Sequence, residues 1–395
     1  MSELLFLAHR IPYPPDRGDK IRSWHMLRHL AGLARVHLAC FADDEADAAH
    51  LPALRAALPA LGEVHVEVRR TGRAVAAARA LLEGRPLSLA AFDSPAMRRF
   101  VEATARKTDA IFAFSGQMAQ FVPARARLAM DFVDMDSAKF EAYAEAGGPL
   151  ASLYRREAAK LFAFERATAA RAEVSLFVSE AEAALFRARA GLPQADIRAL
   201  QNGVDLEFFR PGAVPAAATP RPLIVFTGQM DYPPNVDAVR WFAVEVLPRL
   251  PDARFAIVGR SPAAAVRALA GDRVIVTGGV DDVRPWLAAA DVVAAPLRIA
   301  RGVQNKVLEA MAAGRPVVAT PAAFEGIEAE PGRDLIVADG APAQAEAIRA
   351  LLAEPMRAAA LGAAARRCVE RAYAWEARLA PLAGLLGLSE RQAAA

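Results

Sequence analysis

One stretch of the chain, Gly302 to Thr320, combines residue types that bind phosphate. It reads GVQNKVLEAMAAGRPVVAT, which predicts a loop, a short helix, a glycine turn and a buried strand. Lys306 falls where the loop becomes a helix, and Glu309 follows one turn later. Unpaired N–H groups and the partial positive charge of a helix N-terminus stabilise a phosphate placed there. The stretch therefore predicts a nucleotide-phosphate site, although an ordinary amphipathic helix would also explain an isolated Lys-x-x-Glu.

The spacing of apolar residues gives this short helix two faces. We expect Leu308, Met311 and Ala312 to face a core and Glu309 to face the opposite, ligand side. Gly314 is expected to end the helix. A loop, helix and strand in this order are typical of ligand sites beyond the strands of a parallel sheet.

A second candidate loop follows the first apolar run and reads HRIPYPPDRGDK. Its prolines stiffen it, and Gly18 permits a tight turn or the close approach of a ligand. Asp16, Asp19 and Lys20 could contact hydroxyls or phosphate at the start of the next helix. Alternatively, Asp19 only caps that helix. His9 is a further candidate, because it ends the first predicted strand.

A third candidate, Met130–Ser137, reads MDFVDMDS and follows another apolar run. Asp131, Asp134 and Asp136 come every two or three residues. Three carboxylates are compatible with a Mg²⁺ site. They are equally compatible with capping the next helix or with binding sugar hydroxyls, and we favour these readings over a metal because the chain has no other cluster of ligand residues.

Composition restricts the class of protein. The chain has 395 residues, of which 54% are hydrophobic, and this indicates two or three folded domains. The net charge of +3 makes nucleic acid an unexpected partner. Cys40 and Cys368 form neither a metal-spaced cluster nor a disulfide framework. No signal peptide and no apolar run long enough to span a bilayer are evident, so we expect a cytoplasmic protein.

Short apolar runs alternate with helical stretches along the whole chain. A proline-rich segment, 211–222, interrupts this alternation and reads as a linker. The strands expected before the linker are Leu4–Ala8, Val36–Phe41, Val64–Val68, Ile111–Phe114, Leu128–Phe132, Val174–Val178 and Ile197–Leu200. Those expected after it are Leu223–Thr227, Phe255–Val258, Val274–Thr277, Val292–Ala295, Val317–Ala319 and Leu335–Val337. The pattern predicts two doubly wound α/β domains with parallel sheets and a ligand site in the cleft between them.

With these pieces in order, the chain resembles the retaining glycosyltransferases of family 4, which have the GT-B fold. It most resembles the sugar transferases associated with PEP-CTERM/exosortase A systems. The motifs that carry the resemblance are HRIPYPPDRGDKIR, MDFVDMDS, FVSEAEA, QNGVD, FTGQMDYPPNVDAV and GVQNKVLEAMAAGRPVVAT. The resemblance implies an acceptor domain over residues 1–205, a nucleotide-sugar donor domain over 206–375, and a C-terminal helix over 376–395 that crosses back to the first domain.

The resemblance also implies roles for individual residues. Glu309 would bind the ribose hydroxyls, while Lys306 and the preceding backbone would face the diphosphate. Arg301 stands where the family often has a Glu that holds the donor sugar. The donor-side set is Gly18, Gly228, Arg301, Gly302, Val303, Gln304, Asn305, Lys306 and Glu309; the acceptor-side set is His9, Asp16, Asp19, Lys20 and Asp134; the catalytic set is Lys306, Glu309 and Asp131.

The implied reaction is transfer of a sugar, with retention of anomeric configuration, from a UDP- or GDP-sugar to a glycan or lipid-linked acceptor in exopolysaccharide synthesis. No metal or other cofactor is expected. A sugar-nucleotide epimerase or hydrolase of the same architecture is one alternative, and a non-catalytic sugar-nucleotide-binding protein, suggested by Arg301, is another. The segment Arg69–Lys107 carries nine basic and three acidic residues. It could rest on the inner membrane face or be an ordinary solvated surface.

Overall fold

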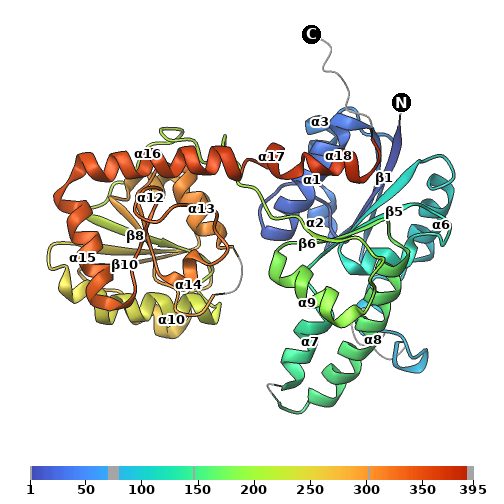
Figure 1. Ribbon diagram of the computed structural model, residues 1–395, viewed down its shortest axis with the longest axis horizontal. Coiled ribbons are helices and arrows are strands. Elements are labelled where there is room, and N and C mark those ends of the chain that lie inside the picture. Colours follow the sequence, from blue (N-terminus) through green and yellow to red (C-terminus); the bar gives the residue numbers. More distant parts are fainter. Residues whose placement is uncertain (1, 70–79, 146, 301–302, 389–395) are drawn as a thin grey trace, which may run out of the picture. The chain divides into compact units, whose positions relative to one another are not determined.

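The computed structural model describes residues 2–69, 80–145, 147–300 and 303–388. The chain divides into two compact units (Figure 1). Unit 1 comprises Met1–Asn202 and Leu379–Ala395, and unit 2 comprises Gly203–Arg378. The division thus falls three residues before the boundary expected after Asp205. Each unit is described by itself below.

Unit 1 is built on a seven-stranded parallel sheet. Its strands are β1 (Glu3–Ala8), β2 (Arg35–Ala42), β3 (Val64–Val68), β4 (Ala110–Phe114), β5 (Leu128–Val133), β6 (Val174–Phe177) and β7 (Ile197–Ala199). They lie in the order β3-β2-β1-β4-β5-β6-β7, so the winding direction reverses between β1 and β4. Residues 4–8 of β1 are completely buried. Burial on both faces explains the continuous apolar runs in the sequence.

The helices of unit 1 connect and cover these strands. They are α1 (Gly18–Leu33), α2 (Glu45–Ala48), α3 (Leu51–Ala57), α5 (Leu87–Ala90), α6 (Pro95–Thr104), the 3₁₀ helix η1 (Gly116–Phe121), α7 (Asp136–Glu145), α8 (Ala151–Arg171), α9 (Glu180–Ala190) and α18 (Pro381–Leu385). The helices α7 and α8 pack together as a hairpin. The C-terminal α18 packs against α1, at the other end of the sequence, and so belongs to unit 1.

Unit 2 repeats the architecture with a six-stranded parallel sheet. Its strands are β8 (Leu223–Thr227), β9 (Arg254–Val258), β10 (Val274–Gly278), β11 (Val292–Ala295), β12 (Val317–Ala319) and β13 (Ile336–Val337), in the order β10-β9-β8-β11-β12-β13. Here the reversal falls between β8 and β11. Every strand expected from the sequence is present, and the prediction of two doubly wound domains is confirmed.

Helices flank the second sheet as well. They are α10 (Pro233–Trp241), the π-helical turn η2 (Phe242–Val246), the 3₁₀ turn η3 (Leu247–Arg249), α11 (Ala264–Arg267), α12 (Arg284–Ala289), α13 (Asn305–Ala312), α14 (Pro321–Phe324), α15 (Gly340–Ala353) and α16 (Pro355–Ala372). The short helix α17 (Trp375–Leu379) crosses the division between the units. Figure 1 shows α16 and α10 on opposite sides of this sheet. The stretch Pro233–Arg249 is therefore an α-helix followed by two differently wound turns.

The structure covers only part of the basic segment Arg69–Lys107. Residues 70–79 of this segment, which hold three of its nine basic side chains, lie outside the described residues. Among the helices formed by residues that are described, none combines the length and the apolar character needed to cross a membrane. Contact with a membrane surface stays a prediction.

Candidate nucleotide-phosphate site

Lys306 lies in the first turn of α13, beyond the carboxyl end of β8. Its Nζ donates a hydrogen bond to Asn235 Oδ1 at 2.5 Å and lies 4.7 Å from the centroid of the Phe226 ring. Asn235 is buried in α10, and its Nδ2 donates to the carbonyl oxygen of Gln229 at 2.8 Å. Strand, loop and two helices thus fix the position of one ammonium group.

The electrostatics of this position favour an anion. Burial lowers the pKa of Lys306 to about 8, against the attraction of Glu309. Burial also raises the pKa of Glu309 to about 7, against the attraction of Lys306. No carboxylate of the described residues lies within ion-pair distance of Lys306 Nζ. A desolvated cation without a carboxylate partner is stabilised by an anion that binds beside it.

Two glycines make room for the ammonium group. A Cβ atom on Gly228, whose φ is 157°, would lie 3.2 Å from Lys306 Nζ and 2.8 Å from Asn235 Nδ2. A Cβ atom on Gly259 would lie only 1.6 Å from the carbonyl oxygen of Gly228. The loops after β8 and β9 therefore touch backbone to backbone. This contact explains the glycine at the end of each strand.

The predicted core face of α13 is confirmed. Leu308, Met311 and Ala312 are at most 1% exposed and pack in the core of unit 2. Glu309 is half-buried, and its position on the ligand side stays a prediction. Gly314 follows the helix with a φ of 66°, the left-handed conformation expected at a helix end.

The loop before α13 is only partly described. Val303 packs against Gly326, Gln304 is half-buried, and Asn305 is exposed at the first position of the helix. Arg301 and Gly302 lie outside the described residues. The roles expected of these loop residues on the diphosphate and donor sugar stay predictions.

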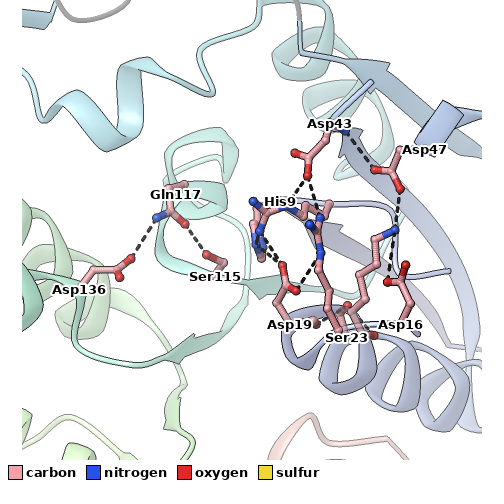
Figure 2. Close-up of polar contacts among 12 residues, drawn as sticks. His9, Asp16, Asp19, Ser23, Asp43, Asp47, Ser115, Gln117 and Asp136 are labelled. Atoms are coloured by element: carbon pink, nitrogen blue, oxygen red, sulfur yellow. Dashed lines mark hydrogen bonds and ion pairs between the residues drawn. The ribbon is translucent and has the colours of Figure 1, made fainter. Parts of the chain in front are cut away.

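A network of ion pairs lies beyond β1 and β2 in unit 1 (Figure 2). Asp19 Oδ2 lies 2.6 Å from Arg10 Nη1 and 3.2 Å from His9 Nε2. Asp43 accepts hydrogen bonds from Arg10, Arg17 and Arg69 at 2.5 to 2.8 Å. Although burial opposes the effect, these basic partners hold the pKa values of both carboxyl groups well below their usual range. Both carboxylates are ionised. Together with Lys20, Asp16 and Asp47 close by, the network holds four arginine or lysine side chains and four carboxylates, so its formal charges balance.

The remaining candidates of the first loop lie close by. Lys20 is only 3% exposed, and its Nζ donates to Asp47 Oδ1 at 2.6 Å. Asp16 Oδ1 lies 4.0 Å from the same nitrogen and is exposed. A Cβ atom on Gly18 would meet no protein atom within 4 Å. The fold thus leaves open space at Gly18, whereas Lys20 is committed to an ion pair.

The carboxylates of MDFVDMDS lie in three different environments. Asp131 is completely buried, and Arg22 Nε donates to its Oδ2 at 2.9 Å. Asp134 is exposed between β5 and α7. Asp136 accepts a hydrogen bond from Gln117 at 3.0 Å, and burial raises its pKa. The described residues contain no group of three side chains that could hold a metal ion.

The backbone beside these carboxylates is strained. Ser115 and Val133, directly after β4 and at the end of β5, have φ values of 74° and 70°. A β-branched residue rarely adopts this conformation, which costs of order 1–3 kcal/mol and is found most often at functional sites. Figure 2 shows Ser115, Gln117 and Asp136 on one side of His9 and the contacts of Asp19 on the other. The ring of His9 stacks on Phe114, with a centroid distance of 5.8 Å.

Several of these residues were absent from the site predicted from the sequence. Arg10 and Asn235 lie in the quoted motifs HRIPYPPDRGDK and FTGQMDYPPNVDAV but were assigned no role, and Asp43 and Gln117 lie in no motif. Their roles depend on contacts across 71 residues for Asn235 and 33 for Asp43. Asp43 shares one sequence signal with the site residues that were predicted as candidates: it directly follows an apolar strand.

Part of unit 2 is similar to known sugar transferases. Residues 221–354 match the family model described as "Glycosyl transferases group 1", a range that includes Gly228, Asn235, Lys306 and Glu309. The GDP-mannose-dependent alpha-(1-6)-phosphatidylinositol monomannoside mannosyltransferase of Mycolicibacterium smegmatis is 32% identical over 238 residues, 54% of this chain and 62% of the relative. The corresponding Mycobacterium tuberculosis enzyme is 31% identical over 54% of this chain and 61% of its own. The match spans less than two thirds of these relatives.

Solved structures resemble the chain over nearly its full length. Sucrose-phosphate synthase from Thermosynechococcus elongatus has a TM-score of 0.67 at 19% identity, with 98% of each chain covered. Anabaena Alr3699/HepE in complex with UDP has a TM-score of 0.63 at 18% identity, with 98% of this chain and 99% of that one covered. WaaG, a glycosyltransferase involved in lipopolysaccharide biosynthesis, has a TM-score of 0.60 at 16% identity, with 97% and 100% covered. The fold is GT-B, as the sequence predicted.

Proposed function

We propose that the protein is a glycosyltransferase that binds a nucleotide-diphosphate sugar on unit 2. One observation carries the proposal. Lys306, a desolvated ammonium group without a carboxylate partner, lies in the first turn of α13 and within the range that matches the glycosyltransferase model. Such a group suits the pyrophosphate of a sugar nucleotide, because an anion there gains both the ammonium charge and the helix N-terminus.

The chemistry follows from these positions. When the bond between sugar and diphosphate breaks, negative charge grows on the leaving phosphate, and Lys306 stabilises that charge. Glu309, one turn further along α13, accepts hydrogen bonds from the ribose hydroxyls. The acceptor hydroxyl attacks from the side of the leaving group and gives its proton to a phosphate oxygen, so the anomeric configuration is retained. The residues around His9 and Asp19 in unit 1 bind the acceptor.

The finer assignments rest on resemblance. The donor is a UDP- or GDP-sugar, consistent with the UDP complex of one structural neighbour and the GDP-mannose dependence of the curated relatives. The acceptor is a glycan or a lipid-linked sugar in exopolysaccharide synthesis of the exosortase-associated type, as the sequence motifs suggest. In this proposal Asp131 supports the end of β5 through Arg22 and does not touch substrate, because it is completely buried.

Donor consumption tests the proposal. UDP- and GDP-sugars are incubated with the protein, with and without a panel of glycan and lipid-linked acceptors, and nucleoside diphosphate release is measured. We expect acceptor-dependent release, which falls at least about 100-fold in Lys306→Ala. Arg371→Gln, an exposed change outside the site, serves as the control. Anomeric configuration is read by NMR of the product.

Three results would contradict the proposal. Release or isomerisation that needs no acceptor would identify a hydrolase or an epimerase. Tight binding without turnover across the panel would identify a binding protein. Unchanged turnover in a folded Lys306→Ala variant would remove Lys306 from the mechanism.

A further inference from the structure

A cavity of about 860 Å³ lies in unit 2 at the amino ends of its strands. Its lining includes Pro222, Asp291 and Pro316, the residues directly before β8, β11 and β12. The candidate phosphate site lies beyond the carboxyl ends of the same sheet. The two places also fall at opposite ends of α13, because Lys306 is in its first turn while Ala313 and Gly314, just past its end, line the cavity. Eight helical residues separate them by about 12 Å.

Most of the cavity wall is apolar. The apolar lining residues are Pro211, Pro222, Pro316, Leu351, Leu352, Pro355, Ala358, Ala359 and Ala363. They come from the segments before β8 and β12 and from α15 and α16. A cavity of this size and character can enclose most of an organic ligand.

The charged lining residues are mainly arginines. Arg315 is half-buried; its Nη1 donates to the carbonyl oxygen of Ala290 at 3.3 Å, and its Nε is buried without a hydrogen-bond partner among the described residues. Arg367 is exposed on α16, and the described residues give it no ion pair. Burial lowers the pKa of Arg315, nearby Arg221 lowers it further, and Asp291, which is paired with Arg221, offsets only part of this shift. The first two effects disfavour an uncompensated charge, which an anion in the cavity would compensate.

The other charges of the lining are already paired. Arg221 forms an ion pair with Asp291, the only acidic lining residue, and Leu223 N–H also donates to that carboxylate. Arg366 Nε donates to Glu370 at 2.6 Å, and its Nη1 donates to the carbonyl oxygens of Leu206 and Ala312. The cavity therefore has an excess of two unpaired guanidinium groups, those of Arg315 and Arg367.

We infer that this cavity is a second ligand site, distinct from the nucleotide-phosphate site, that binds an amphipathic organic anion. The anionic head, a phosphate or a carboxylate, meets the guanidinium groups of Arg315 and Arg367, which can donate two parallel hydrogen bonds to either group. The apolar body lies against the leucine, proline and alanine side chains of α15 and α16. Charge and apolar surface are both needed, so neither inorganic phosphate nor a neutral alcohol is a good ligand.

Isothermal titration calorimetry on the full chain tests the inference with four probes below their micelle concentrations: octyl phosphate, octanoate, inorganic phosphate and octanol. The variants are Arg315→Gln, Arg367→Gln and Ala363→Trp, which fills the cavity and leaves every arginine in place. Arg371→Gln removes the same charge from α16 outside the cavity and is the matched control. Lys306→Ala tests independence from the nucleotide site, and thermal unfolding checks that each variant is folded.

We expect at least one of octyl phosphate and octanoate to bind at least about tenfold more tightly than inorganic phosphate or octanol. The ratio of the affinities of octyl phosphate and octanoate identifies the preferred head group. Binding should weaken about tenfold or more in Arg315→Gln and Ala363→Trp, weaken less in the exposed Arg367→Gln, and stay unchanged in Arg371→Gln and Lys306→Ala.

Other results would overturn the inference. Absence of binding by either amphipathic anion, or equal binding of inorganic phosphate or octanol, removes the proposed ligand class. Equal affinity in Ala363→Trp and wild type places the binding elsewhere. Loss of binding in Lys306→Ala assigns it to the nucleotide site. A dimer in solution that Ala363→Trp converts to a monomer makes the cavity a contact between two copies of the chain.

Discussion

The polar residues beyond β1 and β2 in unit 1 and those beyond β8 in unit 2 balance their charges differently. In unit 1, Asp19 and Asp43 each meet at least two basic side chains, and Lys20 is paired with Asp47. In unit 2, Lys306 has an amide and an aromatic ring as neighbours, and its pKa is lowered. The same position in two similar sheets thus carries a neutralised network in one unit and an unbalanced cation in the other.

The difference separates two ways of building a binding surface. A neutralised network holds its side chains in place without a ligand and suits recognition of neutral hydroxyls by directed hydrogen bonds. Burying a cation without a carboxylate partner lowers the stability of the fold, because the charged group has lost its hydration. An anion that binds beside it offsets this cost, and the gain adds to the affinity for the anion. Under the proposed function, unit 2 would set the affinity for the charged donor, and unit 1 would set the orientation of the acceptor.

The largest expected effect concerns the glycines at the two sites. Gly259→Ala should lower the free energy of unfolding of unit 2 by about 4 kcal/mol or more, because the new Cβ would overlap the Gly228 carbonyl oxygen. Gly18→Ala, in open space, should change stability by less than about 1 kcal/mol. Urea unfolding measures both, and similar effects of the two changes would contradict the backbone contact in unit 2.

The buried ion pair of unit 1 gives the next effect. Arg22→Ala leaves the carboxyl group of Asp131 in the core without its partner and should cost about 3–5 kcal/mol. Lys306→Ala removes a desolvated cation that has no ion pair, so it should leave the free energy of unfolding unchanged or raise it. Equal losses of unfolding free energy in the two variants would show that Lys306 stabilises the fold as much as Arg22 does, and would contradict the difference between the two units.

Donor affinity should depend on pH through Lys306. In the unliganded protein this group is protonated below about pH 8 and becomes neutral above it. Because a diphosphate prefers the charged form, its affinity should fall as pH rises above 8, by about tenfold near pH 9 relative to pH 6.5. Calorimetry of UDP or GDP binding from pH 6.5 to 9.5 measures the fall. Lys306→Arg keeps its charge and should give a flat profile; a parallel decline in this variant would assign the titration elsewhere.

The smallest effect is expected from the neutralised network. Asp43→Asn removes one half-exposed carboxylate and should cost about 1 kcal/mol or less of stability. Nucleoside diphosphate affinity should stay within about twofold of wild type, because the change lies in the other unit. Calorimetry and urea unfolding check both values, and a tenfold change in affinity would refute the separation of roles.

The helices and strands and the core face of α13 were predictable because they depend on the order of residues along a short stretch of chain. Continuous apolar runs give the strands of covered parallel sheets, as in Leu223–Thr227 and Val317–Ala319, where the predicted and observed bounds coincide. The position of Glu309 opposite Leu308 and Met311 follows from helical spacing alone. Local order also located Lys306 at the start of a helix.

The partners of the predicted residues were not predictable. The contact between Lys306 and Asn235 joins residues 71 apart, and that between Arg22 and Asp131 joins residues 109 apart. Such contacts depend on which strands become neighbours, and strand order is not encoded in spacing. From the sequence, Asp131 was placed in the catalytic set. In the structure it is completely buried against Arg22, which favours a role in holding the end of β5 in place.

Binding of UDP and GDP to wild type and to Lys306→Ala, measured side by side by calorimetry at pH 7, tests the central claim most directly. We predict that at least one nucleotide binds wild type and that Lys306→Ala weakens it about 100-fold, close to 2.7 kcal/mol, while Arg371→Gln binds as wild type does. Uptake of neither nucleotide by wild type, or equal affinity in a folded Lys306→Ala variant, would contradict the account.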